Sequence, residues 1–190
     1  DGNLYAYLTG EPHLVKVGEK TCFYVFDSIS NTFSVAPLII YATSGDKLSY
    51  NTDYTYENNV LTIKSGTPIT IRNTDPSTHT TDRIEVADGV SANITLAGVN
   101  IDVSSNSGTA AFKIADDSFP VDFITLANDS VNTLKSGSNC AGLQMNKYLC
   151  IQGEGKLIAT GGEGGAGIGG GYNESVSNIR ITGGTVIATG

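Results

Sequence analysis

The sequence predicts an all-β chain that folds as a right-handed parallel β-helix, also called a β-solenoid, with a β cap at its N-terminal end. Composition gives the first indication, because 23 glycines, one methionine and no tryptophan among 190 residues suit strands and tight turns better than helices. The second indication is a set of short alternating apolar pairs that recur at nearly regular intervals along the chain, which is typical of stacked repeats. The third is that no helical period competes with this pattern.

Residues 1–56 contain strand-like segments that show no repeat. These segments are LYAYL at 4–8, TCFYVF at 21–26 and PLIIY at 37–41. A solenoid exposes apolar side chains and unpaired backbone groups at an open end, which must be covered. We therefore expect residues 1–56 to form an N-terminal β cap or a small accessory β domain.

Residues 57–190 carry the repeats and are expected to form the parallel β-helix. Side chains at alternate positions of a strand point to the same face, so the recurring apolar pairs stack inward as one column. We expect the first member of each pair to lie beside the first member of the next. The pairs are Ile94/Leu96, Ile124/Leu126, Leu149/Ile151 and Ile179/Ile181. The segment LIATG at 157–161 also returns as VIATG at 186–190, one coil later.

A second register supports the same stacking. Phe112, Leu143 and Ile168 each follow a pair of small residues, which suits the tight corners of a coil. The glycine-rich run 161–171 keeps Ile168 in phase with the earlier coils, so we expect a turn-rich rung there rather than a flexible linker. Because the chain stops at Gly190 directly after a rung, we expect the β-helix of the natural protein to continue further.

Charge and cysteine content narrow the classes of partner. Acidic side chains outnumber basic ones by 19 to 11, which gives a formal net charge of −8, so neither nucleic acid nor an anionic membrane surface is an expected partner. No stretch reaches the roughly 20 apolar residues of a membrane-spanning helix.

The cysteines, Cys22, Cys140 and Cys150, form no C-x-x-C pair. Two alternatives remain for Cys140 and Cys150. They form a disulfide bond, or they are free, buried thiols, which is the commoner case.

Several phrases follow one another in a characteristic order: NNVLTIKSG at 58–66, SANITLAGVNIDV at 91–103, NTLKSG at 132–137 and GAGIGGG at 165–171. Through them the stretch 48–190, about three quarters of the chain, resembles the β-helical repeat region of large secreted or wall-anchored proteins of Gram-positive, largely gut-dwelling bacteria. Related β-helical modules bind carbohydrate. The resemblance implies an extracellular module, secreted or anchored to the cell wall, that binds a polysaccharide or a host glycan. The alternatives are an adhesin for a host extracellular protein such as an immunoglobulin, and a passive structural stalk.

Aromatic and polar side chains gather just before the repeats, and they are the candidate ligand-binding residues. Exposed aromatic rings stack on sugar rings, while amides and carboxylates bind sugar hydroxyls. Tyr54 and Tyr56 share one face of an extended strand. The alternative is that these tyrosines bury their rings at the junction with the solenoid and keep their hydroxyls in water, which is the commoner behaviour of tyrosine. The candidates are Tyr50, Asp53, Tyr54, Tyr56 and Asn58.

Two further kinds of chemistry depend on carboxylates. Parallel β-helices include polysaccharide lyases and hydrolases, but Asp116 and Asp117 are the only adjacent acidic pair, and aspartate at such a place commonly marks a turn. We therefore expect binding rather than catalysis. Calcium prefers carboxylate and carbonyl oxygens in loops, so Asp102, Asp116 and Asp117 are the candidate calcium ligands, although no EF-hand pattern is present.

Overall fold

The computed structural model describes residues 13–17, 20–27, 32–115, 122–146, 148–176 and 178–190. All regular elements in these ranges are β-strands. The prediction of an all-β chain is therefore confirmed for the described residues. No helix in this part of the chain is long and apolar enough to cross a membrane.

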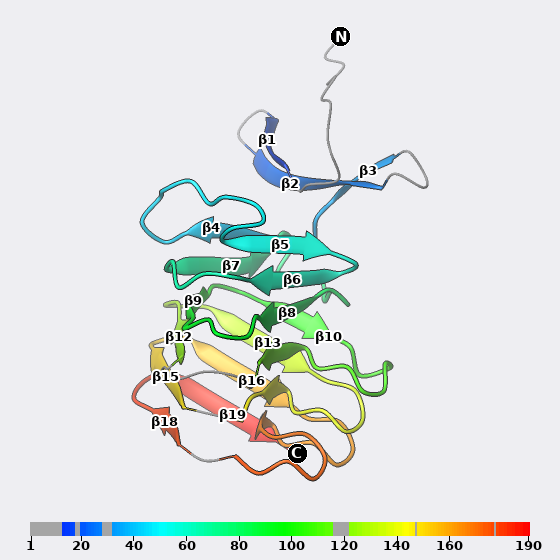
Figure 1. Cartoon of the computed structure of the whole chain (residues 1–190), viewed down its shortest axis with the longest axis vertical. Coiled ribbons are helices and arrows are strands. Elements are labelled where there is room, and N and C mark those ends of the chain that lie inside the picture. The colour runs from blue at the N-terminus through cyan, green and yellow to red at the C-terminus, as the bar shows by residue number, and fades with distance from the viewer. Residues whose placement is uncertain (1–12, 18–19, 28–31, 116–121, 147, 177) are drawn as a thin grey trace.

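Three β-sheets form a parallel β-solenoid, which confirms this part of the predicted architecture (Figure 1). The chain visits the three sheets in turn and makes about four coils. Sheet 1 contains β4 (Leu38–Ala42), β7 (Ile69–Asn73), β9 (Asn93–Leu96), β12 (Asp122–Leu126), β15 (Leu149–Gly153) and β18 (Ile179–Ile181). Sheet 2 contains β5 (Tyr54–Glu57), β6 (Val60–Ile63), β8 (Arg83–Val86), β11 (Phe112–Ile114), β14 (Leu143–Gln144) and β17 (Ile168–Gly169). Sheet 3 contains β10 (Asn100–Asp102), β13 (Val131–Lys135), β16 (Lys156–Thr160) and β19 (Thr185–Thr189).

The register of sheet 1 confirms the stacking of the repeats and corrects one step of it. Ile94 pairs with Ile124, which pairs with Ile151, which pairs with Ile181. The middle step therefore runs from Ile124 to Ile151 rather than to Leu149, which lies beside Asp122. Because a shift of two residues keeps a side chain on the same face of its strand, the apolar column survives this difference.

The other two sheets follow the predicted registers. Phe112, Leu143 and Ile168 lie side by side in β11, β14 and β17, so the glycine-rich run 161–171 contains a rung of the solenoid. In sheet 3, Leu157 and Ala159 of β16 pair with Val186 and Ala188 of β19. This pairing confirms the repeat of LIATG as VIATG.

Alternation along each strand sends one set of side chains into a continuous core. In β16 the side chains of Leu157 and Ala159 are buried, while those of Lys156, Ile158 and Thr160 are only partly buried. The fully buried side chains of the solenoid are mostly isoleucine and leucine, with Phe112 the largest. Burial of each such side chain contributes about 1.5–3 kcal/mol, so the stacked column is the main stabilising feature of the fold.

At the corners between strands, side chains form hydrogen bonds with backbone N–H and carbonyl groups. The Oδ1 atom of Asn132 accepts hydrogen bonds from the backbone N–H groups of Gly98 and Val99, each at 2.9 Å, and its Nδ2 atom donates to the carbonyl oxygen of Lys156 at 3.1 Å. Asn132 thus links three successive coils. Glycine is needed where coils approach closely, since a Cβ atom at Gly137 would lie 1.8 Å from a backbone oxygen of the preceding coil.

Antiparallel strands replace the parallel pattern at the N-terminal end of the solenoid. β4 pairs antiparallel with β7 in sheet 1, and β5 pairs antiparallel with β6 in sheet 2. The solenoid sheets thus begin at Leu38, before the boundary expected between residues 56 and 57. A separate antiparallel sheet precedes them and consists of β1 (His13–Val17), β2 (Lys20–Asp27) and β3 (Thr32–Val35).

Candidate functional site

The tyrosines of β5 lie in the core rather than on the surface. Tyr54 and Tyr56 pair with Ile63 and Leu61 of β6, and their side chains are only 6% and 4% exposed. The phase of β5 directs both rings inward with the apolar column. Both rings are therefore buried, as the alternative expected, and they do not form an exposed platform for a sugar.

The hydroxyl of Tyr56 is also held inside the protein. It donates a hydrogen bond to the Oδ2 atom of Asp82, and it accepts one from the backbone N–H of Leu38 at 3.3 Å. Burial, followed by the negative charge and the hydrogen bond of Asp82, raises the pKa of Tyr56. Burial likewise raises the pKa of Asp82, although the hydrogen bond from Tyr56 opposes this. This pair connects β4, β5 and the segment before β8.

The remaining candidates of this cluster make structural contacts close to the same strand. Asp53 accepts hydrogen bonds from the Ser49 N–H at 2.8 Å, the Ser65 hydroxyl at 2.7 Å and the Thr67 hydroxyl at 3.2 Å. These bonds, that of Ser49 first, lower the pKa of Asp53. Tyr50 donates a hydrogen bond from its hydroxyl to Glu57 Oε1 at 2.8 Å, and its ring packs edge-on against Tyr54, with centroids 5.5 Å apart.

Asn58 occupies a turn position rather than a binding position. Asn58 and Asn59 form the two-residue loop between β5 and β6 and have φ angles of +51° and +62°. A hairpin turn with two positive φ angles is the type I′ geometry, which asparagine tolerates better than most residues. The structure brings Tyr50 and Tyr54 into contact, whereas Asp53 and Asn58 lie at opposite ends of β5. The contacts of the five predicted residues stabilise the N-terminal end of the solenoid.

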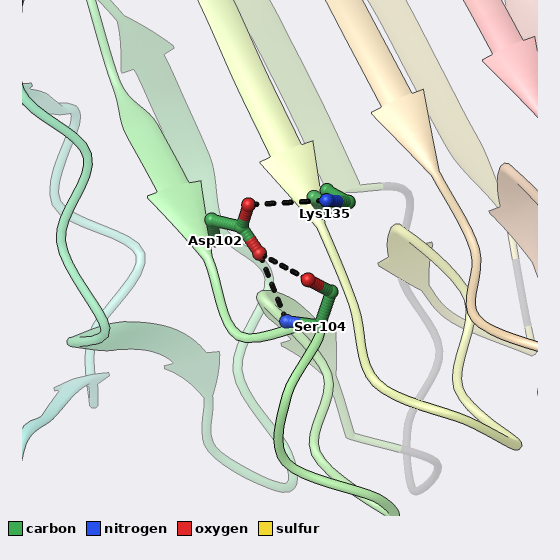
Figure 2. A network of polar contacts seen from close by, with 3 residues as sticks. All are labelled: Asp102, Ser104 and Lys135. Carbon is green, nitrogen blue, oxygen red and sulfur yellow. Dashed lines mark hydrogen bonds and ion pairs between the residues drawn. The ribbon is translucent and has the colours of Figure 1, made fainter.

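The predicted calcium ligand Asp102 is occupied by hydrogen-bond donors (Figure 2). Its Oδ1 atom accepts from the N–H of Ser104 at 3.0 Å and from the Ser104 hydroxyl at 2.6 Å, and its Oδ2 atom lies 3.2 Å from Lys135 Nζ. Partial burial is the largest single influence and raises the pKa of Asp102, but the contacts with Ser104 and Lys135 together outweigh it and lower the pKa.

The other predicted calcium ligands, Asp116 and Asp117, lie outside the described residues. Within the described ranges, no group of three or more histidine, cysteine, aspartate or glutamate side chains is arranged to hold a metal ion. The Lys135 ammonium group already neutralises Asp102, and a cation beside it would be repelled. Asp102 therefore acts as a local link between β10, the loop after it and β13.

A groove of about 440 Å³ lies on the outer surface of sheet 1. Phe123 of β12, Cys150 of β15 and Arg180 of β18 are direct neighbours across three successive coils. Phe123 and Arg180 are exposed, whereas the short side chain of Cys150 is buried between them. A small residue between two large ones leaves a hollow in the sheet surface. The lining residues are Phe123, Tyr148, Leu149, Cys150, Asn178, Ile179 and Arg180.

Aromatic side chains and one cation give this groove its chemical character. Phe123 is 38% exposed and Tyr148 is 53% exposed, so both rings are available to a ligand. Cys150 is a free thiol, as is Cys140, and the Cys150 sulfur lies 3.9 Å from the Thr182 hydroxyl oxygen. Among the described residues that line the groove there is no carboxylate and no histidine, and the side chains present offer stacking, hydrogen bonding and a positive charge.

Sequence reasoning passed over this groove because its residues are dispersed. They lie in three separate repeats, whereas the tyrosine cluster of residues 50–58 is contiguous. One signal was present in β12, where Ile124 and Leu126 hold the inward positions and the aromatic Phe123 therefore takes an outward one. No family model, curated protein or solved structure matches the chain.

Proposed function

We propose that this chain is an extracellular binding module that holds a glycan in the aromatic groove of sheet 1. The observation that carries the proposal is the pair of exposed aromatic side chains, Phe123 and Tyr148, that line a hollow of about 440 Å³. Ligand pockets are typically concave, largely apolar and about 300–1,000 Å³ in volume, with a few polar groups that orient the ligand. The groove has this size and this mixture of side chains.

Aromatic rings suit a sugar because both partners have flat, partly apolar faces. Stacking removes the apolar C–H face of a pyranose ring from water while its hydroxyls stay free for hydrogen bonds. Tyr148, which lines the groove, adds a hydroxyl to its aromatic ring. The groove thus supplies the two kinds of contact that a glycan needs.

Binding without cleavage is the activity that the groove supports best. Hydrolysis of a glycosidic bond commonly requires two carboxyl groups about 5–9.5 Å apart. The described residues that line the groove include neither aspartate nor glutamate. The extracellular location, with secretion or attachment to a cell wall, rests on the resemblance of the repeat phrases to those of bacterial surface proteins.

The experiment compares groove aromatics with matched aromatics elsewhere. Phe123→Ala and Tyr148→Ala are tested against Tyr41→Ala and Tyr172→Ala, whose tyrosines are 43% and 61% exposed and lie outside the groove. A glycan array identifies ligands of the unmodified chain, and titration calorimetry then measures their affinity. We expect each groove substitution to weaken binding about tenfold, or about 1.4 kcal/mol, and the two control substitutions to leave it unchanged.

Three outcomes would contradict the proposal. If the control variants lose as much affinity as the groove variants, the ligand binds elsewhere on the surface. If the array shows no ligand and the immobilised chain retains a host extracellular protein, the chain is a protein-binding adhesin. If neither assay shows a ligand, the solenoid is a passive stalk.

A further inference from the structure

We infer that the groove selects a glycan that carries a carboxylate, such as a uronic acid, and that Arg180 binds this carboxylate. The inference rests on the proposed function and adds the chemical class of the ligand. A guanidinium group is planar and always charged, and it donates two parallel hydrogen bonds to one carboxylate. Such a contact distinguishes an acidic sugar from its neutral counterpart.

Arg180 is available for this role because nothing in the described residues neutralises it. The two ion pairs found there join Arg83 to Glu85 and Lys135 to Asp102, and neither involves the groove. Arg180 is exposed and is the only charged side chain among the described residues that line the groove. An unpaired cation beside apolar and aromatic groups attracts an anion more strongly than a cation in open water does.

The spacing of the coils places Arg180 where a sugar ring can lie between it and Phe123. Phe123 and Arg180 are separated by the single strand that carries Cys150, so their backbones are two strand spacings, or about 9.6 Å, apart. A flat ring in van der Waals contact on both sides needs about 7–8 Å. The short Cys150 side chain, only 9% exposed, forms the floor of the groove between Phe123 and Arg180.

The net charge of the chain limits how much negative charge the ligand carries. A formal charge of −8 repels a polymer that is acidic at every sugar, and one arginine neutralises one carboxylate. The favoured ligand therefore has an isolated acidic sugar in an otherwise neutral glycan. The preference of the groove for the acidic sugar over the neutral sugar decreases as salt screens the ion pair.

The test uses two oligosaccharides of identical linkage, one ending in glucuronic acid and the other in glucose, titrated into the folded chain by calorimetry. We expect the acidic oligosaccharide to bind at least about tenfold more tightly. Arg180→Gln removes this preference but keeps the affinity for the neutral sugar, and Arg180→Lys retains part of it. Arg72→Gln is the matched control, since Arg72 is an exposed arginine of the same sheet outside the groove.

A steric variant tests the position of the ring independently of charge. Cys150→Leu fills the hollow between Phe123 and Arg180, and we expect it to weaken both oligosaccharides by a similar factor. The unfolding transition of each variant, followed by circular dichroism, shows that the fold is retained.

The outcomes separate this inference from the proposed function. If both oligosaccharides bind the unmodified chain equally and Arg180→Gln changes neither affinity, the role of Arg180 is wrong while glycan binding stands. If a neutral glycan binds but Phe123→Ala has no effect on it, the groove itself is wrong and both proposals fail.

Discussion

The solenoid contains two aromatic clusters that differ in their exposure to solvent. The end cluster consists of Tyr50, Tyr54 and Tyr56, and the groove cluster consists of Phe123 and Tyr148. In β5 the tyrosines hold the inward positions, whereas in β12 the inward positions belong to Ile124 and Leu126. Strand phase, rather than local aromatic content, therefore decides which rings are available to a ligand.

The two clusters also differ in how their polar atoms are satisfied. The inward hydroxyl of Tyr56 bonds to the buried Asp82 carboxylate, because a buried hydroxyl without a partner is costly. In the groove, Arg180 has no carboxylate partner among the described residues. Substitutions in the end cluster should therefore affect stability, and substitutions in the groove should affect binding.

The largest expected effect is that of Tyr56→Ala. Loss of the buried ring creates a cavity and leaves the Asp82 carboxylate without its donor, so we expect the free energy of unfolding to fall by about 3–5 kcal/mol. Phe123→Ala should lower it by only about 1 kcal/mol, because part of this ring is already exposed to water. Urea denaturation of both variants measures the difference. Equal losses would remove the distinction between the clusters.

A smaller effect is expected at the hairpin that positions the end cluster. Asn58→Val places a β-branched residue at a φ of +51°, which costs about 1–2 kcal/mol because such residues avoid the left-handed region. Asn58→Gly should be close to neutral, since glycine adopts this conformation readily. Thermal unfolding of the two variants provides the measurement. A glycan affinity that falls in both variants, despite an intact fold, would restore Asn58 to the binding site.

The smallest expected effect concerns the pH dependence of the free energy of unfolding, to which Asp82 contributes. Its folded-state pKa is raised by burial, so the folded state binds the proton more tightly than the unfolded state. This contribution to stability is fully present below the unfolded pKa of about 3.9 and is lost as pH rises through the folded pKa. Asp82→Asn should lack this decline. The measurement is the free energy of unfolding of the unmodified chain and of Asp82→Asn at a series of pH values. If the two free energies change with pH in the same way, this role of Asp82 is wrong.

Much of the fold was predictable because the spacing of the sequence repeats shows which strands pair in neighbouring coils. The stacked pairs of sheet 2 and the repeat step of sheet 3 follow from recurring apolar and small residues. The register between β12 and β15 was missed because Leu149 and Ile151 occupy equivalent inward positions, and alternation alone does not choose between them. The right-handed sense of the coil and the capping role of the N-terminal segment stay predictions.

The candidate site was less predictable, for a physical reason. A solenoid surface brings together residues such as Phe123, Cys150 and Arg180 that lie about one coil apart in sequence, so no contiguous motif marks them. The cluster at residues 50–58 is contiguous and rich in tyrosine and asparagine, but pairing of β5 with β6 turns its rings inward. Register must be known before exposure is assigned.

Hydroxyl-radical footprinting with mass spectrometry distinguishes the buried end cluster from the exposed groove cluster, because it reports the exposure of each aromatic side chain. We predict rapid oxidation of Phe123, Tyr148 and Tyr172 and strong protection of Tyr54 and Tyr56, with added glycan protecting Phe123 and Tyr148 but not Tyr172. Oxidation of Tyr54 and Tyr56 as fast as that of Tyr148, or protection of these two tyrosines by the glycan, would mean that the end cluster is exposed and that the groove is not the binding site.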